Sequence, residues 1–393
     1  AMSRKGIYEP MELPTYFADF LKEIRPTKSQ KDDAKAGHET LRKRLHADKT
    51  LSPIIIDTFL QGSYRRSTAI RPNSESCFDV DVIVVTKLDE NHFTPSQAMK
   101  LFEPFLEEHY KDKWEYQGRS IKITLSYVVL DLVVTSAPSE ADIKKLSKAS
   151  VVTDATLEEA EDWRLVESWV LPEDRWRPGI KALLELAQKE AEWKLAPLRI
   201  PDRDTKKWED THPLEQIKWT QAKNKACNKH YINVVKALKW SRRLNHATPK
   251  YPKGYPLEHI IGQCCPDEIG SVAKGVTFTL EEIAVRYADD ARNKRVPFLK
   301  DHGVPLHNVL HRLSADDFVA FHAQVCEDAV IARRALDAKT VKESANEWRK
   351  LFGDKFPPPP DDNDEDDDSS KNTKTGGYTP REQPTVIGGG RYA

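Results

Sequence analysis

Three aspartates in two short apolar segments are the residues of this chain best suited to chemistry. Asp79 and Asp81 lie two positions apart in segment 78–85, and Asp131 lies in segment 127–134. Both segments are short and rich in β-branched residues, which predicts strands. Residues two apart on a strand point to the same face, so Asp79 and Asp81 should project together. Like charges on a mostly apolar strand are costly unless a cation neutralises them, and that cation is usually divalent.

Carboxylates on adjacent strands are what a two-metal site requires. In such a site Mg²⁺ activates an attacking hydroxyl and stabilises a leaving pyrophosphate. A single aspartate in a strand is more often an edge or turn residue, so none of the three is decisive alone. Because the three occur together behind a Gly-Ser turn, we predict that Asp79, Asp81 and Asp131 are both the catalytic residues and the metal ligands.

The Gly-Ser turn is a candidate phosphate-binding site. Gln61, Gly62 and Ser63 follow the apolar segment 54–60 and precede a helix expected near Tyr64. Backbone N–H groups at such a turn suit a nucleoside triphosphate, glycine allows close approach, and a serine hydroxyl can donate to phosphate. We therefore predict that Gln61, Gly62 and Ser63 bind nucleotide. Nearby arginines add positive charge, although a solvated basic loop would look the same: Arg65, Arg66 and Arg71.

The order of these motifs resembles the DNA polymerase β-like nucleotidyltransferase superfamily. Within it, residues 61–70 (QGSYRRSTAI) followed by 78–84 (FDVDVIV) are similar to the bacterial cGAS/DncV-like nucleotidyltransferases, the CD-NTases of antiphage signalling. Residues 253–258 (KGYPLE) are similar to that family and to its oligoadenylate synthetase relatives. The resemblance spans roughly residues 40–350. One departure is a longer spacing between the Gly-Ser pair and the first aspartate, where residues 72–76 look like a small loop insertion.

The resemblance implies an α+β fold with two lobes, an N-terminal mixed-sheet catalytic lobe and a helical C-terminal lobe that enclose two nucleotides. It implies that the three aspartates hold two Mg²⁺ ions and that Gly62 and Ser63 hold the donor triphosphate. It also implies a cyclic di- or trinucleotide second messenger made from ATP, alone or with GTP. A linear oligonucleotide polymerase, an NMP transferase of the same fold and a nucleotide sensor without catalysis remain open alternatives.

The resemblance also directs attention to the helical lobe, where the family uses a lysine for the donor phosphates. Segment 229–245 predicts a helix with a basic side, on which Lys236 and Lys239 are the candidates. A solvated helix face has the same composition. Tyr255 follows a Lys-Gly turn, and its ring would either stack on a base or pack between the lobes. We predict nucleotide contacts for Lys236, Lys239 and Tyr255.

The elements that position these residues divide the chain into three parts. We expect residues 1–150 to form the catalytic lobe with a long bridging helix, residues 151–356 to form the helical lobe, and residues 357–393 to form an acidic flexible tail. The expected strands are at 54–60, 78–85 and 121–135. The expected helices are at 13–24, 28–48, 96–110, 155–167, 178–194, 229–245, 279–294, 314–338 and 340–352, with another beginning near Pro256.

Composition argues against several functional classes. The net charge is −1, and the tail after Phe356 has eight acidic and four basic residues, which leaves about +3 for the rest. That charge gives no strong sign of a surface for duplex nucleic acid. Five cysteines without Cys-x-x-Cys spacing predict a reduced protein without zinc. We find no signal peptide and no apolar run of membrane-spanning length, so we expect a cytoplasmic bacterial protein that does not bind membranes.

The tail cannot bury a core of its own. Four prolines are followed by a stretch in which seven of eight residues are acidic, and then by a segment rich in Ser, Thr and Gly. A solvating tail is the plain explanation. The resemblance offers another, because some family members have mobile C-termini that a ubiquitin-transfer-like conjugating enzyme joins to target proteins. The expected partners are therefore ATP, other NTPs and, as a hypothesis, such an enzyme.

Overall fold

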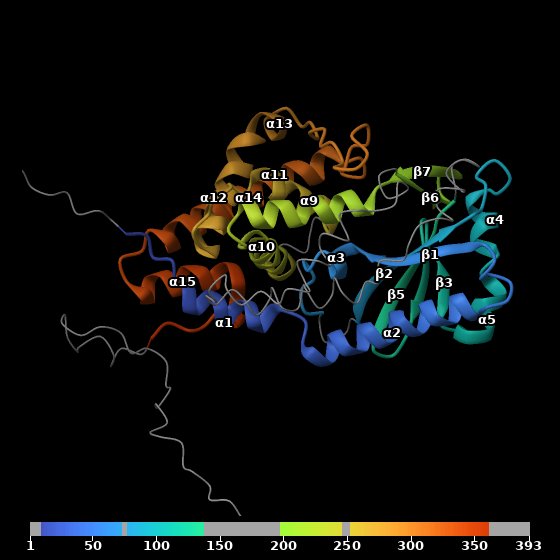
Figure 1. Cartoon of the computed structure of the whole chain (residues 1–393). Coiled ribbons are helices and arrows are strands. Elements are labelled where there is room, and N and C mark those ends of the chain that lie inside the picture. Colours follow the sequence, from blue (N-terminus) through green and yellow to red (C-terminus); the bar gives the residue numbers. More distant parts are fainter. Residues whose placement is uncertain (1–8, 73–76, 137–196, 246–251, 361–393) are drawn as a thin grey trace, which may run out of the picture. The chain divides into compact units, whose positions relative to one another are not determined.

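The computed structural model describes residues 9–72, 77–136, 197–245 and 252–360 (Figure 1). The described residues up to Pro359 belong to one compact unit, which contains all of the labelled helices and strands. The helices expected at 155–194, most of the loop insertion and the acidic tail lie outside the described residues. Of the helices described, none combines the length and the apolar character needed to cross a bilayer.

A five-stranded mixed sheet carries the three aspartates. β2 and β5 are parallel neighbours, and the other pairs of strands are antiparallel. One continuous strand at 121–135 is wrong, because the Leu125 N–H donates to the Val128 carbonyl across a turn that reverses the chain. The order across the sheet is β1 (Ile55–Gln61), β2 (Phe78–Thr86), β5 (Val128–Val134), β4 (Ile121–Thr124) and β3 (Trp114–Tyr116).

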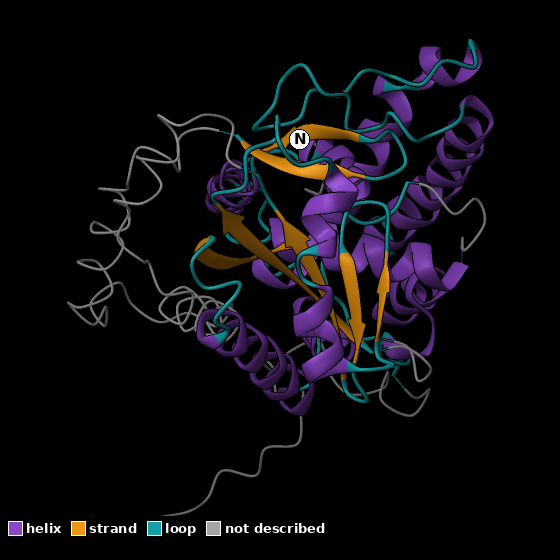
Figure 2. Cartoon of the chain, turned by 90° about the vertical axis from the view of Figure 1, so that its right-hand side faces the viewer, coloured by secondary structure: helices purple, strands orange, loops and turns teal. Residues whose placement is uncertain are grey.

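Helices cover one face of this sheet (Figures 1 and 2). Val80, Val82 and Val84 of β2 alternate toward that face and are completely buried, as the period of two in a strand requires. The expected helix at 96–110 is divided in two, because Pro104 cannot continue a preceding helix and instead begins a new one. The covering helices are α2 (Lys28–Ala47), α4 (Pro95–Lys100) and α5 (Glu103–Tyr110).

The opposite face of the sheet is covered in part by a hairpin of β6 (Leu198–Asp202) and β7 (Lys207–Thr211). Leu198 packs against Ile83 and Val133 on this face. The sequence favoured helices throughout this part of the chain and missed the hairpin. Ile83 lies two residues after Asp81 on β2, and Val133 lies two residues after Asp131 on β5. Residues two apart on a strand project from the same face, so the carboxylates lie on the face that the hairpin covers in part.

A second hydrophobic core lies among the helices of the C-terminal half. α1 (Pro14–Ile24) also packs there, although it comes first in the chain: Phe20 stacks on Phe352 at 4.4 Å between ring centroids. The helix expected at 279–294 begins earlier, because the Ser271 side chain caps it by accepting from the Lys274 N–H. The elements after the hairpin are α9 (Pro213–Ala226), α10 (Tyr231–Asn245), α11 (Tyr255–Cys264), α12 (Val272–Arg286), α13 (Ala288–Arg292), α14 (Ala315–Leu336), α15 (Val341–Phe352) and a 3₁₀ turn, Gly353–Lys355.

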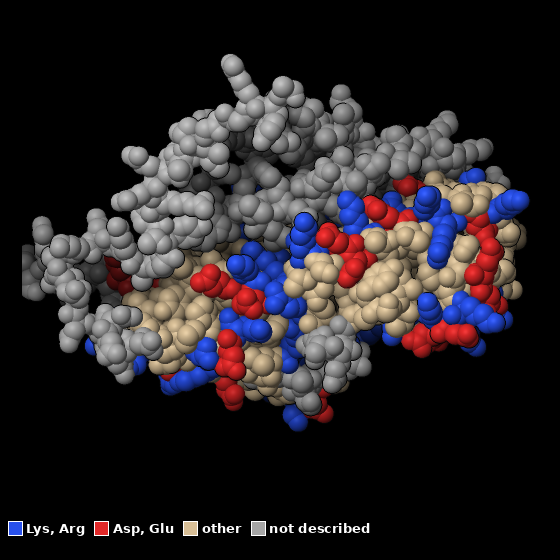
Figure 3. Space-filling view, turned by 90° about the horizontal axis from the view of Figure 1, so that it is seen from below, with Lys and Arg blue, Asp and Glu red and all other residues tan. Residues whose placement is uncertain are grey.

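The charged side chains are mixed over the surface. On the face drawn in Figure 3, Lys and Arg alternate with Asp and Glu across the described residues. Many of them form exposed ion pairs, such as that between Arg286 and Glu282. Exposed pairs of this kind contribute little to stability, on the order of 0–1 kcal/mol.

Candidate active site

The three predicted aspartates lie together at one end of the sheet. Asp81 is directly opposite Asp131 in the parallel pairing of β2 with β5, and Gln61 of β1 is directly opposite Asp81. Opposed residues on neighbouring strands project from the same face of a sheet. Asp79 lies two residues before Asp81 and therefore shares that face. The structure thus brings together all three carboxylates that the sequence singled out.

These carboxylates carry negative charge that the protein only partly balances. Burial and the charge of Asp79 raise the pKa of Asp81 to about 6, and Arg66 offsets part of that rise. Burial and the charges of Asp79 and Asp81 raise the pKa of Asp131 to about 7. Burial also raises the pKa of Asp79. Such shifts mark a group of like charges that a bound cation would stabilise.

The donor set fits a hard divalent cation. Asp131 Oδ1 is buried, and none of the described residues donates a hydrogen bond to it. Across the described part of the chain, however, no three His, Cys, Asp or Glu side chains are already close enough to hold an ion by themselves. Carboxylate oxygens are the ligands that Mg²⁺ prefers, so chemistry and charge both fit, while the side chains must turn toward the ion.

The Gly-Ser turn lies directly against the aspartates. β1 ends at Gln61, and Gly62 has a φ of +77° as the chain enters α3 (Gly62–Arg65). A Cβ atom on Gly62 would lie 1.8 Å from Asp81 Oδ2, so only glycine fits there. α3 is a single turn, so its dipole is weak, and the close backbone approach is the main feature of this turn.

A cavity of about 980 Å³ opens beside the turn and is lined from both cores. Of the predicted residues, Asp131 and Lys236 are not on its wall. Asp131 lies one strand behind Asp81, whereas Lys236 is 2% exposed among the helices of the second core. The predicted residues on the wall are Gln61, Gly62, Ser63, Asp79, Asp81, Lys239 and Tyr255.

A buried charge network forms the helical side of this cavity. Arg66 pairs with Glu258 of α11 at 3.1 Å between Nε and Oε2, and Lys239 Nζ lies 3.0 Å from Glu258 Oε1. Burial alone would raise the pKa of Glu258, but the two cations outweigh burial and lower it to about 2. The Arg66 guanidinium also lies 5.1 Å from the centre of the Tyr255 ring. This network holds Lys239 and Tyr255 at the cavity wall.

The other two arginines near the turn do not line the cavity. Arg71 Nε donates to the Arg25 carbonyl and its Nη2 to the Lys22 carbonyl, which ties the chain after the turn to the end of α1. Arg65 is buried, with 4% of its surface exposed. Of the three arginines, Arg66 alone contributes to the cavity wall.

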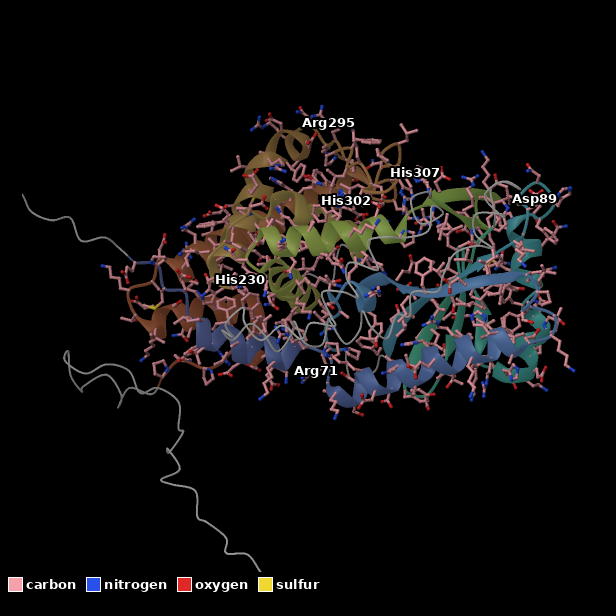
Figure 4. The ribbon with its side chains drawn as sticks, in the orientation of Figure 1. Arg71, Asp89, His230, Arg295, His302 and His307 are labelled. Carbon is pink, nitrogen blue, oxygen red and sulfur yellow. The ribbon has the colours of Figure 1, made fainter. Side chains whose placement is uncertain are left out.

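Sequence reasoning missed one wall of the cavity, the loop between α13 and α14. Phe298, which is 58% exposed, and Leu306, which is 91% exposed, lie on the cavity wall together with His307. His302, labelled with His307 in Figure 4, anchors this loop by stacking on Trp219 at 3.8 Å between ring centroids. The segment between α13 and α14 has no regular spacing of hydrophobic residues, which predicts a loop. That pattern does not predict that the loop lines the cavity.

Comparison with known proteins decides the family. Residues 11–138 match the family model described as the Second Messenger Oligonucleotide or Dinucleotide Synthetase domain, SMODS. Over 380 residues the chain is 49% identical to a probable cyclic AMP-AMP-GMP nucleotide synthase of Salmonella paratyphi B, covering 95% of this chain and 97% of that protein. The chain belongs to the bacterial CD-NTases. It is a nucleotidyltransferase that synthesises cyclic oligonucleotides.

One further relative supports this membership, and one solved structure resembles the chain in its fold. This CD-NTase is 48% identical over 353 residues to a cyclic AMP-AMP-GMP synthase of Enterobacter hormaechei subsp. hoffmannii, covering 88% of this chain and 92% of that one. The structure of the CD-NTase CdnG of Bradyrhizobium diazoefficiens in complex with GTP has a TM-score of 0.60 at 12% identity, covering 86% of this chain and 94% of CdnG. The second likeness concerns the fold, and it confirms the predicted two-lobed, polymerase β-like α+β architecture.

Proposed function

We propose that this CD-NTase joins two ATP molecules and one GTP molecule into a cyclic AMP-AMP-GMP trinucleotide. Two relatives with 49% and 48% identity over most of their length bear that product in their names. In each of the three joining steps, a ribose hydroxyl attacks the α-phosphorus of a triphosphate and pyrophosphate leaves. The last step closes the ring. The observation that carries the proposal is the Asp81–Asp131 pairing next to Gly62 at a cavity lined from both cores.

The proposal includes two Mg²⁺ ions held by Asp79, Asp81 and Asp131. Their oxygen donors, their shared negative charge and the unpartnered Asp131 Oδ1 support this assignment. When bound, the ions would make the acceptor hydroxyl more acidic and balance the charge of the transferring phosphate.

The chain's own groups divide the remaining work. Asp131, directly opposite Asp81 in the sheet, would help to accept the proton of the acceptor hydroxyl. Gly62 lets the backbone approach the donor triphosphate, and the Ser63 hydroxyl donates to it. Lys239 pairs with the phosphates, and the Tyr255 ring packs against a base. Lys236 supports α10 from within the second core.

Product analysis tests the proposed function. The purified chain is incubated with Mg²⁺ and with ATP, GTP or both, then treated with phosphatase and examined by mass spectrometry. We expect a phosphatase-resistant product with the mass of a cyclic AMP-AMP-GMP only when both nucleotides are present. A resistant all-adenine or dinucleotide product would overturn the base assignment, and phosphatase-sensitive chains would show a linear polymerase.

Loss of two carboxylates tests the metal assignment. Asp79→Asn combined with Asp81→Asn should abolish product formation while circular dichroism and Tm show a folded protein, because both side chains lie at the cavity rather than in a hydrophobic core. Full residual turnover in this variant would refute the assigned roles.

A separate proposal concerns the acidic tail. We propose that a ubiquitin-transfer-like conjugating enzyme acts on residues 357–393, whose composition suits an accessible segment. Removal of this segment should abolish conjugation to target proteins and leave nucleotide synthesis in vitro unchanged. Equal loss of both activities would contradict the proposal.

A further inference from the structure

Two buried thiols meet where two helices of the second core end. Cys227 caps the C-terminus of α9, and Cys265 caps the C-terminus of α11. Their sulfur atoms are 4.0 Å apart, and the two residues are 0% and 2% exposed. Both cysteines are free in this structure. They are 38 positions apart in the chain, so tertiary packing brings the two sulfur atoms together.

The backbone around this thiol pair is held without help from the sulfur atoms. The Glu268 N–H, just after the end of α11, donates to the Ala226 carbonyl at the end of α9, at 2.8 Å. Lys223 of α9 also pairs with Asp267, at 2.7 Å between Nζ and Oδ1. The two segments that carry the thiols therefore lie side by side while the thiols are reduced.

The geometry of the thiol pair suits a disulfide bond. Bonded sulfur atoms are about 2.0 Å apart, so each sulfur must move by only about 1 Å, which a small rotation of each side chain supplies. The thiol pair also lies close to the surface, because Pro266 and Asp267, which follow Cys265 in the chain, are both exposed. A small neutral oxidant can therefore reach the sulfur atoms after a slight opening of this segment.

We propose that Cys227 and Cys265 are an oxidation site, at which hydrogen peroxide converts the two thiols to a disulfide that joins the ends of α9 and α11. The reaction consumes two thiols and one peroxide molecule and yields one disulfide and two water molecules. One thiolate attacks a peroxide oxygen and becomes a sulfenic acid, and the hydroxide that leaves takes up a proton. The second sulfur then attacks the sulfenic sulfur, and the oxygen leaves as water.

The disulfide should stabilise the helical half of the chain. It would close a loop that contains the whole of α10 and α11, and such a closure removes conformational freedom from the unfolded chain. The cavity residues of these two helices, Gln216 of α9 and Tyr255 of α11, lie in the first turn of each helix, at the end away from the thiol pair. The inference thus does not depend on the proposed function.

Peptide mapping of the oxidised protein is the first test. The full chain is treated with hydrogen peroxide, its remaining thiols are alkylated after unfolding, and its peptides are examined by mass spectrometry. Of the five cysteines, we expect three to be alkylated and two to appear in one linked pair of peptides, which contain Cys227 and Cys265. Dithiothreitol should restore all five free thiols.

Thermal stability is the second test. The oxidised protein should melt about 5–10 °C above the reduced protein, and dithiothreitol should reverse the shift. Cys227→Ala should abolish this rise in Tm. Cys326→Ala is the matched control, because Cys326 lies on α14 beside His322, and this variant should keep the full rise.

Several results would overturn the proposal. These are five thiols that stay free in peroxide, a disulfide from Cys265 to Cys264 or to a second chain, sulfinic acids that dithiothreitol does not reduce, and an equal rise in Tm in Cys227→Ala. If Cys227→Ala does not fold, the peptide map of the unaltered chain decides alone.

Discussion

Arg66 and Glu258 form a buried ion pair between the Gly-Ser turn and the second core. They are 192 residues apart in the chain, yet Arg66 Nε lies 3.1 Å from Glu258 Oε2, and each side chain is only 5% exposed. Glu258 also binds Lys239, and Arg66 also lies over the Tyr255 ring. The position of the turn is thus fixed by the same carboxylate that orients the helical wall of the cavity.

Loss of the Glu258 carboxylate should therefore cost much stability. Glu258→Gln leaves Arg66 and Lys239 buried without their counter-charge, and breaking one partner of a buried pair costs about 3–5 kcal/mol. Urea unfolding should show a corresponding fall in the midpoint without a change in slope. Glu282→Gln is the control, since the Glu282–Arg286 pair is about 40% exposed on both sides. That change should cost about 0–1 kcal/mol, and equal losses in the two variants would contradict the argument.

Gly62→Ala should abolish synthesis, with kcat reduced on the order of 100-fold or more because a misplaced catalytic carboxylate is that costly. The added Cβ would lie 1.8 Å from Asp81 Oδ2, at a φ of +77° that an alanine rarely adopts. Gly254→Ala is a matched control on the same cavity, because Gly254 also has a positive φ of +57° but no atom lies within 4 Å of its added Cβ. Steady-state kinetics should show a much smaller loss for Gly254→Ala, and comparable losses would mean that backbone strain, rather than contact with Asp81, matters.

Acid should destabilise the loop between α13 and α14 that lines the cavity. Burial lowers the pKa of His259 to about 4 and that of His302 to about 3. Between these values and about 6.5 the unfolded chain binds protons that the folded chain does not, so stability falls as the pH falls through this window. For a ring like His259 this loss is on the order of 2 kcal/mol at pH 5.

His302→Phe tests whether His302 contributes to the loss of stability at low pH. The variant keeps the ring stacked on Trp219, and no described residue hydrogen-bonds to His302 Nε2. We expect the Tm difference between pH 7.5 and pH 5 to be smaller in His302→Phe than in the unaltered protein. An unchanged difference in His302→Phe would show that His302 is not responsible.

The sequence alone predicted the parts of the site that follow from the repeat of one strand or from one backbone angle. Asp79 and Asp81 share a face because a strand repeats every two residues, and Gly62 is required by a single backbone angle. The pairing of Asp81 with Asp131 depends instead on a parallel register between strands about fifty residues apart, which no local pattern specifies. The placement of Lys122 opposite Asp131 was hidden for another reason, because the sequence predicted one continuous strand where the chain turns back between β4 and β5.

Other parts of the site depend on tertiary packing alone. The strands of the β6–β7 hairpin have five residues each, and Pro201 within β6 argues against a strand, although an edge position tolerates it. Tyr255 and Glu258 lie one helical turn apart and share the cavity wall, although the sequence singled out only Tyr255. Arg66 showed no sign of its distant partner, because charge pairing across 192 residues leaves no local trace.

Lys236 and Lys239 occupy different environments, although the helix period predicts one role for both. Residues three apart lie on neighbouring positions of one helix face, so the sequence predicted the same role for both. In the structure Lys236 is 2% exposed within the second core, whereas Lys239 reaches the cavity wall and donates to the Thr68 carbonyl at 2.9 Å. Lys239→Met should raise the KM for nucleotide about tenfold, the cost of one charge-assisted contact of roughly 1.4 kcal/mol. Lys236→Met should change Tm and leave KM unaltered, and a rise in KM for Lys236→Met alone would reverse the two assignments.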